Sequence, residues 1–118
     1  MNSQEYKTKT NDEDVLDYRT LKATKEELER IGQTEILSNI ERILTQNRIE
    51  KPTLHSQIEN ESTNFYIIDL SFEDIDTIVS MFFDLEVGTL GSNYETTSEA
   101  TFYAKMLDKW SNLPSYKY

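Results

Sequence analysis

The side chains most often used for nucleophilic and acid–base catalysis are scarce in this sequence. His55 is the single histidine, it stands beside Ser56, and the chain has no cysteine. A Ser–His–carboxylate arrangement also needs a group that orients the histidine and donors that stabilise an oxyanion, and no motif here supplies them. We therefore predict a protein that is not an enzyme and has no catalytic residues. In it, His55 is an ordinary surface or turn residue.

Three acidic side chains, Glu73, Asp74 and Asp76, are the nearest approach to a metal-binding motif. The calcium-loop pattern with its glycine and closing glutamate is absent, and one histidine without cysteine excludes zinc. On a helix, Asp74 and Asp76 point about 200° apart, so they cannot chelate one ion together. Gly88 and Gly91 lack the further glycine and the lysine of phosphate-binding loops. We predict no metal and no cofactor.

The charge of the chain is strongly acidic and unevenly placed. The formal net charge is −10, from 22 acids and 12 bases. Residues 1–51 hold 11 acids and 9 bases, whereas residues 52–118 hold 11 acids and 3 bases. From Pro52 to Ala104 there is no Lys or Arg. A field of one sign repels nucleic acids and anionic membranes and attracts basic surfaces. We therefore expect neither direct nucleic-acid binding nor membrane binding.

Aromatic side chains accompany these acids. Tyrosine is frequent, at seven of 118 residues, and Tyr94 falls in a predicted loop where burial is not expected. Carboxylates can occupy the phosphate positions of a basic groove while rings stack where bases would. Some acids already have a helix-capping role, and setting them aside leaves a smaller set. The predicted partner-binding residues are Glu59, Glu61, Asp69, Asp76, Asp84, Glu86 and Tyr94.

This combination favours a protein-interaction module whose partner is a basic, nucleic-acid-handling protein. An inhibitor or adaptor of the immunity-protein or phage anti-defence type fits that chemistry. Two other classes stay open. One is a structural subunit of a larger assembly such as a virion or multi-protein complex, and a homo-oligomer also stays open. The other is a small-molecule binder that uses His55, Asp69 or Tyr103.

No segment of the sequence predicts export or membrane insertion. The N-terminal residues are polar and lack the apolar region of a signal peptide. No apolar run approaches the roughly 18–20 residues that span a bilayer. Together with the absence of cysteine, this favours a cytoplasmic location, in the host cytoplasm if the protein is phage-encoded.

The length and the hydrophobic periodicity predict one α+β domain over residues 15–113, with a polar arm at 1–14 and a tail at 114–118. A short helical stretch is expected around Val15 to Leu21. A capping box at Thr24 then opens a long helix that contains Gly32 and ends near Asn47. Residues 53–70 read as a β-hairpin, with the firmer strand at 65–70.

Two further helices form a C-terminal helical hairpin. Ser71 is the expected N-cap of the first, which should end before Gly88. The second begins between Ser92 and Ser98 and is ended by Pro114. The predicted core comprises Leu28, Ile36, Ile40, Leu44, Ile67, Leu70, Ile75, Val79, Phe82, Phe102, Met106, Leu107 and Trp110.

Overall fold

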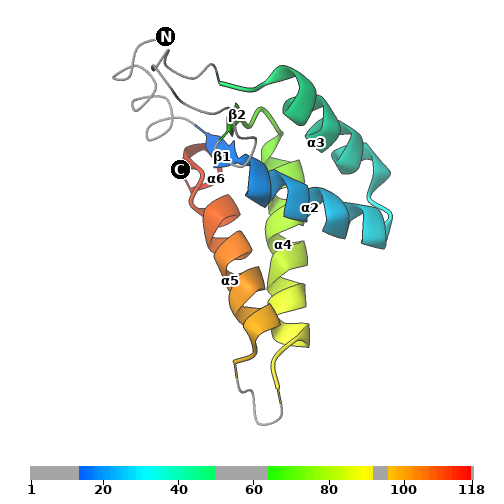
Figure 1. The fold of residues 1–118 in the computed structure, drawn as a ribbon, viewed down its shortest axis with the longest axis vertical. Coiled ribbons are helices and arrows are strands. Elements are labelled where there is room, and N and C mark those ends of the chain that lie inside the picture. Colours follow the sequence, from blue (N-terminus) through cyan, green and yellow to red (C-terminus); the bar gives the residue numbers. More distant parts are fainter. Residues whose placement is uncertain (1–13, 50–63, 92–95, 118) are drawn as a thin grey trace, which may run out of the picture. The chain divides into compact units, whose positions relative to one another are not determined.

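The computed structural model describes residues 14–49, 64–91 and 96–117. They are mostly helical with a small two-stranded antiparallel sheet, which confirms the α+β class. The chain divides into two compact units, residues 1–69 and 70–118, and each is described by itself. The elements in chain order are β1 (Val15–Asp17), α2 (Tyr18–Ile31), α3 (Thr34–Gln46), β2 (Phe65–Ile67), α4 (Phe72–Gly88), α5 (Ser98–Ser111) and α6 (Pro114–Lys117) (Figure 1).

The first unit begins with a strand where a short helix was expected. β1 pairs antiparallel with β2, with Leu16 opposite Tyr66. Backbone hydrogen bonds extend the pairing on both sides, from the Tyr18 amide to the Asn64 carbonyl and from the Ile68 amide to the Asp14 carbonyl. The helical prediction for Val15 and Leu16 is therefore wrong, because pairing with a distant strand outweighs a local apolar spacing. α2 begins directly after it, at Tyr18.

β2 is hydrogen-bonded along both of its edges. One edge holds β1, and residues 47–49 bond to the other through the Ile49 amide and the Phe65 carbonyl (2.8 Å) and through the Ile67 amide and the Asn47 carbonyl (3.0 Å). A strand has only two edges, and both edges of β2 are already paired. β2 therefore has no edge left to pair with the nearby segment 53–59, and the expected hairpin is wrong. Residues 53–59 lie outside the described part of the chain.

The predicted long helix is divided in two at Gly32. This glycine adopts φ 76° and ψ 24°, the left-handed conformation that a side chain disfavours. The Gly32 amide bonds to the Glu29 carbonyl and the Gln33 amide to the Leu28 carbonyl, which is the Schellman pattern of a helix C-terminus. α3 then ends with Asn47 as its C-cap, as predicted.

Thr24 is not an N-cap, so the predicted capping box is wrong. It lies inside α2, fully buried, and its hydroxyl donates to the Thr20 carbonyl (2.7 Å). Its proposed partner Glu27 is buried as well and forms an ion pair with Arg30 (3.1 Å). The helix starts about two turns earlier because the β1 pairing places Asp17, with extended dihedrals, at the N-cap.

The core of the first unit follows the alternation of β2. Tyr66 and Ile68 are buried and Ile67 is half-buried, so the prediction chose the less buried side of this strand. Successive strand residues point to opposite faces, and the two faces here carry almost equally apolar side chains. Predicted positions Leu28, Ile36 and Ile40 are buried, and Leu44 is half-buried. Further buried apolar residues are Leu16, Leu21, Ile43 and Ile49.

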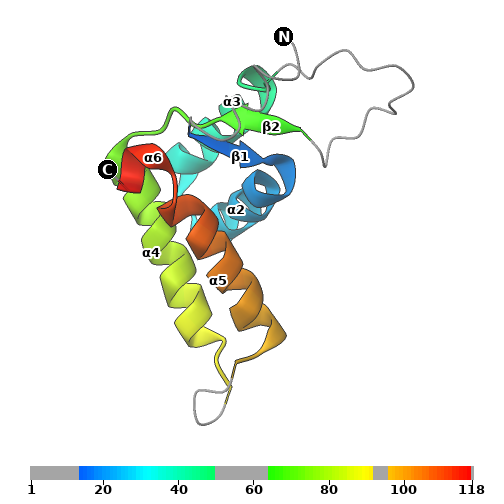
Figure 2. The ribbon, with the colours of Figure 1, turned by 90° about the vertical axis from the view of Figure 1, so that its left-hand side faces the viewer.

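The second unit contains the predicted pair of helices, and α4 and α5 lie side by side in both views (Figures 1 and 2). Ser71 caps α4 as predicted, since its hydroxyl accepts a hydrogen bond from the Asp74 amide (3.2 Å). Thr97 caps α5 by accepting from the Ala100 amide (3.0 Å) and also donates to the Thr89 carbonyl at the end of α4 (2.6 Å). α5 therefore begins at Ser98, at the end of the predicted range from Ser92 to Ser98.

Pro114 begins a helix rather than only ending one. α5 ends at Ser111, and Pro114 is the first residue of α6, a position that suits proline because its missing N–H is not needed there. Leu113, just before it, is buried. Residues 114–117, expected as a tail, thus form a short helix.

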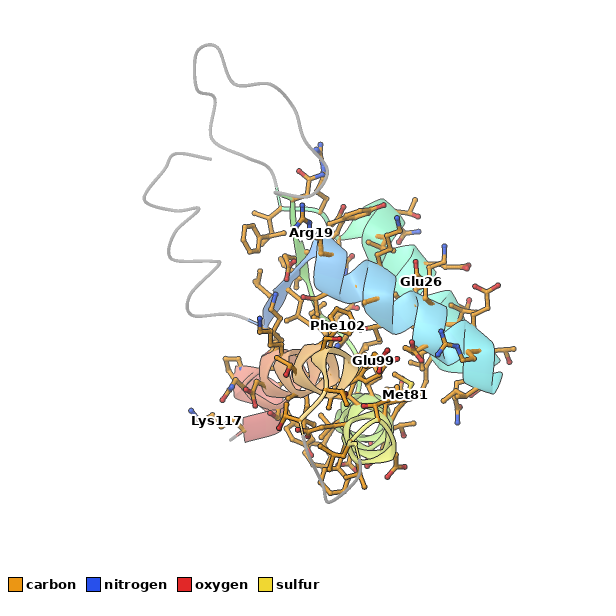
Figure 3. The ribbon with its side chains drawn as sticks, turned by 60° about the horizontal axis from the view of Figure 1, so that its bottom comes forward. Arg19, Glu26, Met81, Glu99, Phe102 and Lys117 are labelled. Atoms are coloured by element: carbon orange, nitrogen blue, oxygen red, sulfur yellow. The ribbon has the colours of Figure 1, made fainter. Side chains whose placement is uncertain are left out.

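Half of the predicted core residues of the second unit are buried, and one of them is exposed. Ile75, Phe82, Met106 and Trp110 are buried, whereas Phe102 is 44% exposed. Phe102 lies about 80° around α5 from Trp110, at the border of the buried side, and Figure 3 shows it on the same helix as Glu99. The predicted positions Leu70, Val79 and Leu107 are half-buried, and Ile78, Met81, Ala100 and Leu113 are additional buried residues.

Candidate protein-binding surface

Helix α4 carries two apolar stripes instead of one. Its buried residues are Ile75, Ile78, Met81 and Phe82. A second set of apolar side chains, at positions 72, 83 and 87, falls within roughly 60° around the helix and is centred roughly 140° from the buried set. An ordinary surface helix has a single apolar stripe and a polar opposite side. The second stripe of α4 therefore needs its own explanation.

The second stripe is open to solvent. Among the described residues, five large apolar side chains are exposed, and three of them stand on α4: Phe72 (54%), Phe83 (54%) and Val87 (49%). Single exposed apolar residues are common on protein surfaces, but a row of them on one helix face marks an interaction surface. We define the exposed α4 face as Phe72, Asp76, Phe83 and Val87 of α4 together with Tyr116 of α6.

One end of the exposed α4 face is held in place by α6. The rings of Phe72 and Tyr116 stack with centroids 5.1 Å apart and an interplanar angle of 14°. The Tyr116 hydroxyl donates a hydrogen bond to Asp76 Oδ1 (2.9 Å). This hydrogen bond, with burial and the nearby negative charge, raises the pKa of Tyr116 above its ordinary value. The two rings are thus fixed relative to each other, while Phe72 stays 54% exposed.

Acidic side chains line both sides of this face. α4 contains five acids and no Lys or Arg. Asp84 is exposed and follows Phe83 on one flank, about 100° around the helix, and Glu86 lies about 60° from Phe83 on the other. Glu73 and Asp74 occupy the first turn, where the helix dipole favours them. Apolar side chains bordered by carboxylates give this surface a chemistry that is complementary to a basic, partly apolar one.

The structure brings together some of the predicted partner-binding residues. Asp76, Asp84 and Glu86 all stand on α4. Glu59, Glu61 and Tyr94 lie outside the described residues. Their grouping with the α4 acids stays a prediction.

Asp69 belongs to the first unit and has a local partner. Arg42 of α3 donates two hydrogen bonds to its carboxylate, at 3.0 Å and 2.8 Å. This bidentate contact holds the pKa of Asp69 below its ordinary value, although partial burial acts in the opposite direction. The charge of Asp69 is therefore largely compensated within the unit, and it offers less attraction to a partner than the unpaired pattern of the sequence indicated.

Sequence reasoning missed the apolar half of the surface. The predicted partner-binding residues include no apolar side chain of α4, so Phe72, Phe83 and Val87 were not anticipated. The signal was nonetheless present, because Phe72 and Phe83 are eleven residues apart, a spacing that returns to almost the same helix face. One broad apolar stripe and two separate apolar stripes look alike in the sequence of a helix. To distinguish them, one must know which side of the helix packs in the core, and only the tertiary structure shows that.

A metal-binding cluster and a membrane-spanning helix are both absent from the described residues. Among them, no group of three His, Cys, Asp or Glu side chains is placed to hold a metal ion. Within the described ranges, no helix is both long and apolar enough to cross a lipid bilayer. His55, the one histidine, lies outside the described residues. Tyr103, named in the small-molecule alternative, packs its ring 6.2 Å from that of Phe82.

The chain matches no protein-family model, no curated protein and no solved structure.

Proposed function

We propose that this protein is a non-enzymatic interaction module that binds a basic protein, acting as an inhibitor or adaptor. The observation that carries the proposal is the exposed α4 face, where large apolar side chains face solvent on a helix with five acids and no base. Partners that handle nucleic acids present the basic, groove-shaped surfaces that suit this chemistry.

The two components of the face have different roles in binding. Burial of Phe72, Phe83 and Val87 against a partner provides most of the affinity, because aromatic and aliphatic anchors dominate interface energetics. The carboxylates at Asp76, Asp84 and Glu86 accelerate encounter with a basic surface and disfavour acidic or neutral partners. Association is accordingly faster and tighter at low ionic strength.

The charge pattern favours this function over the structural-subunit alternative. A permanent subunit interface is large and mostly apolar, with charged residues depleted at its centre. The exposed α4 face instead has Asp76 among its apolar side chains. A mixed face of this kind is typical of an interface that forms and dissociates with a charged partner.

The proposal is tested by capture of native partners on the immobilised full chain at about 50 mM and about 300 mM NaCl, where electrostatic attraction differs strongly. Mass spectrometry then identifies the retained proteins. We expect basic nucleic-acid-handling proteins that are retained at low salt and released at high salt. Retention of neutral or acidic assembly proteins that is insensitive to salt would instead support the structural-subunit function.

A pair of charge-reversal variants provides the control. Asp84→Lys places a base beside Phe83 on α4, whereas Asp108→Lys makes the same change in net charge at an exposed position of α5. We expect Asp84→Lys to reduce capture and Asp108→Lys to leave it nearly unchanged. Equal effects of the two variants would show that the net charge, not the α4 surface, governs binding.

A further inference from the structure

We infer that the exposed α4 face is the binding site for an amphipathic helix of the partner protein. The apolar stripe of that helix is bordered by Lys or Arg on both sides. This inference rests on the proposed function and specifies the structural element that binds. It follows from the length of the exposed stripe, from the position of the acids around it, and from the difference between its two ends.

The length of the stripe suits a helix laid along α4. Phe72 and Val87 are fifteen residues apart, which corresponds to about 22 Å along the helix axis. A partner helix of about fifteen residues has the same length and presents apolar side chains at three- and four-residue spacing. Helices pack along one another by fitting such side chains between those of the neighbour. The row of exposed side chains on α4 provides the complementary half of that packing.

The charges of α4 fix the chemistry of the occupant. Acids border the stripe on both sides, with Asp84 on one flank and Glu86 on the other, and Asp76 lies within it. A partner helix with Lys or Arg on both sides of its apolar stripe can pair with the acids on both flanks of the α4 stripe at once. A partner helix with bases on one flank only would leave the opposite carboxylates unpaired, at a cost in affinity.

The same charges disfavour two other occupants. A second copy that packed through its own α4 would bring five acids against five acids with no base on either helix. An anionic lipid surface would be repelled likewise, since membrane-surface helices carry Lys and Arg beside their apolar side chains. The basic helix of another protein is the occupant that the observations favour.

The two ends of the face differ in how they are prepared. At the first turn of α4, Phe72 is stacked on Tyr116, and Asp76 accepts its hydroxyl hydrogen. At the other end, no aromatic contact of Phe83 is found among the described residues, and Phe83 and Val87 stay about half exposed. Phe72 and Phe83 are equally exposed, at 54% each, so both rings have similar area to bury on binding. Phe83 is the better anchor to test, because its removal leaves the contacts of Phe72 with Tyr116 intact.

The test uses a fluorescein-labelled peptide of about fifteen residues with Leu at helical spacing and Lys on both flanks. A peptide of the same composition in scrambled order serves as the matched control. Anisotropy is measured with the full chain at about 50 mM and about 300 mM NaCl. Amide chemical shifts then locate the contact. We expect the ordered peptide to bind at least about tenfold more tightly than the scrambled one, with shift changes concentrated at residues 72–87.

Two variants of the full chain localise the effect. Phe83→Ser should weaken binding of the ordered peptide by about tenfold or more, because the ring supplies much of the buried area. Phe102→Ser removes another exposed Phe, from α5, and should change the affinity by less than about twofold. Circular dichroism of both variants verifies that the helices are retained. Equal weakening by the two variants, or shift changes outside α4, would overturn the inference.

Failure of this inference and failure of the proposed function give different results. Suppose that basic proteins are captured in a salt-sensitive way and that Phe83→Ser captures them as well as the original chain does. The proposed function is then supported, and binding of a partner helix at the exposed α4 face is refuted. If the ordered peptide binds at α4 but no basic protein is captured, helix binding at the exposed α4 face is supported and the proposed function is refuted. If neither the peptide nor a basic protein binds, both are refuted.

Discussion

The α2–α3 pair and the α4–α5 pair differ most on the surfaces outside their own cores. The exposed side of α2 carries charges of both signs, such as Arg19 and Glu26 (Figure 3), and its exposed large apolar residue is Ile31, at the C-terminal end. α4 instead exposes Phe72 in its first turn and Phe83 further along, on a helix without bases. The first pair has a surface of mixed charge, and the second exposes the apolar stripe that we propose as a binding surface.

The two pairs also differ in how their helix ends are stabilised. The N-cap side chains of α2 and α3 accept no hydrogen bond from a first-turn backbone amide, and the link between the two helices depends on the backbone conformation of Gly32. α4 and α5 are each capped by a hydroxyl, from Ser71 and Thr97. The first pair relies on a left-handed backbone position that suits glycine, and the second on side-chain caps. The comparison thus leads to predictions that should affect one pair and spare the other.

The largest expected effect separates buried from exposed aromatic residues in the second pair. Trp110→Ala removes a fully buried side chain and should lower the free energy of unfolding by about 3–5 kcal/mol. Phe83→Ser, at a 54% exposed position, should change it by less than about 1 kcal/mol. Urea unfolding followed by circular dichroism measures both. A large loss of stability with Phe83→Ser would assign that ring to the fold and not to a partner.

The two described glycines that end helices should respond in opposite directions to alanine. Gly32→Ala forces a side chain into a positive φ and should cost about 1 kcal/mol or more, although no atom blocks the added Cβ. Gly88 is the last residue of α4 and also has free space, so Gly88→Ala should stabilise by about 0.4–1 kcal/mol. Thermal unfolding compares the two. Destabilisation by both would show that α4 needs flexibility at its end.

The capping difference predicts a smaller contrast. Ser71→Ala and Thr97→Ala should each lower the free energy of unfolding by about 1 kcal/mol, because each leaves a first-turn amide without its acceptor. Thr97→Ala should cost more of the two, since its hydroxyl also donates to the Thr89 carbonyl. Gln33→Ala, at the N-cap of α3 where no side-chain hydrogen bond exists, is the matched control and should be nearly neutral. A cost for Gln33→Ala as large as that for Ser71→Ala would contradict the contrast.

The smallest effect is a pH dependence at the exposed α4 face. The pKa of Tyr116 is raised from its ordinary 10.0, so the folded state holds the phenol proton more tightly than the unfolded state. Its contribution to stability is therefore complete below about pH 10 and is lost as the pH rises through the folded-state pKa. Asp76→Asn should lower the Tyr116 pKa toward 10.0, as followed by NMR of labelled tyrosine, and Asp108→Asn should leave it unchanged. An unchanged Tyr116 pKa in Asp76→Asn would refute the role of this hydrogen bond.

The prediction from sequence succeeded where local chemistry decides the structure. Ser71 lies before an apolar run with acids three residues later, and it caps α4. The α3 end at Asn47 and the buried positions Ile40, Phe82 and Trp110 follow from helical spacing alone. The prediction failed at Thr24, where an ideal capping box stands inside a helix, because strand pairing upstream had already set the start of α2.

For the candidate surface, the sequence by itself determined the charge: ten acids and no base between Pro52 and Ala104, whatever the fold. It also placed Glu73 and Asp74 directly after Ser71, in the first turn of a helix, where the helix dipole favours acids. Tertiary structure alone decided which side of α4 is buried, that Tyr116 meets Phe72 and Asp76 across forty residues of sequence, and that Arg42 compensates Asp69. These are contacts between segments distant along the chain, and neither periodicity nor propensity encodes which of two apolar faces is turned inward.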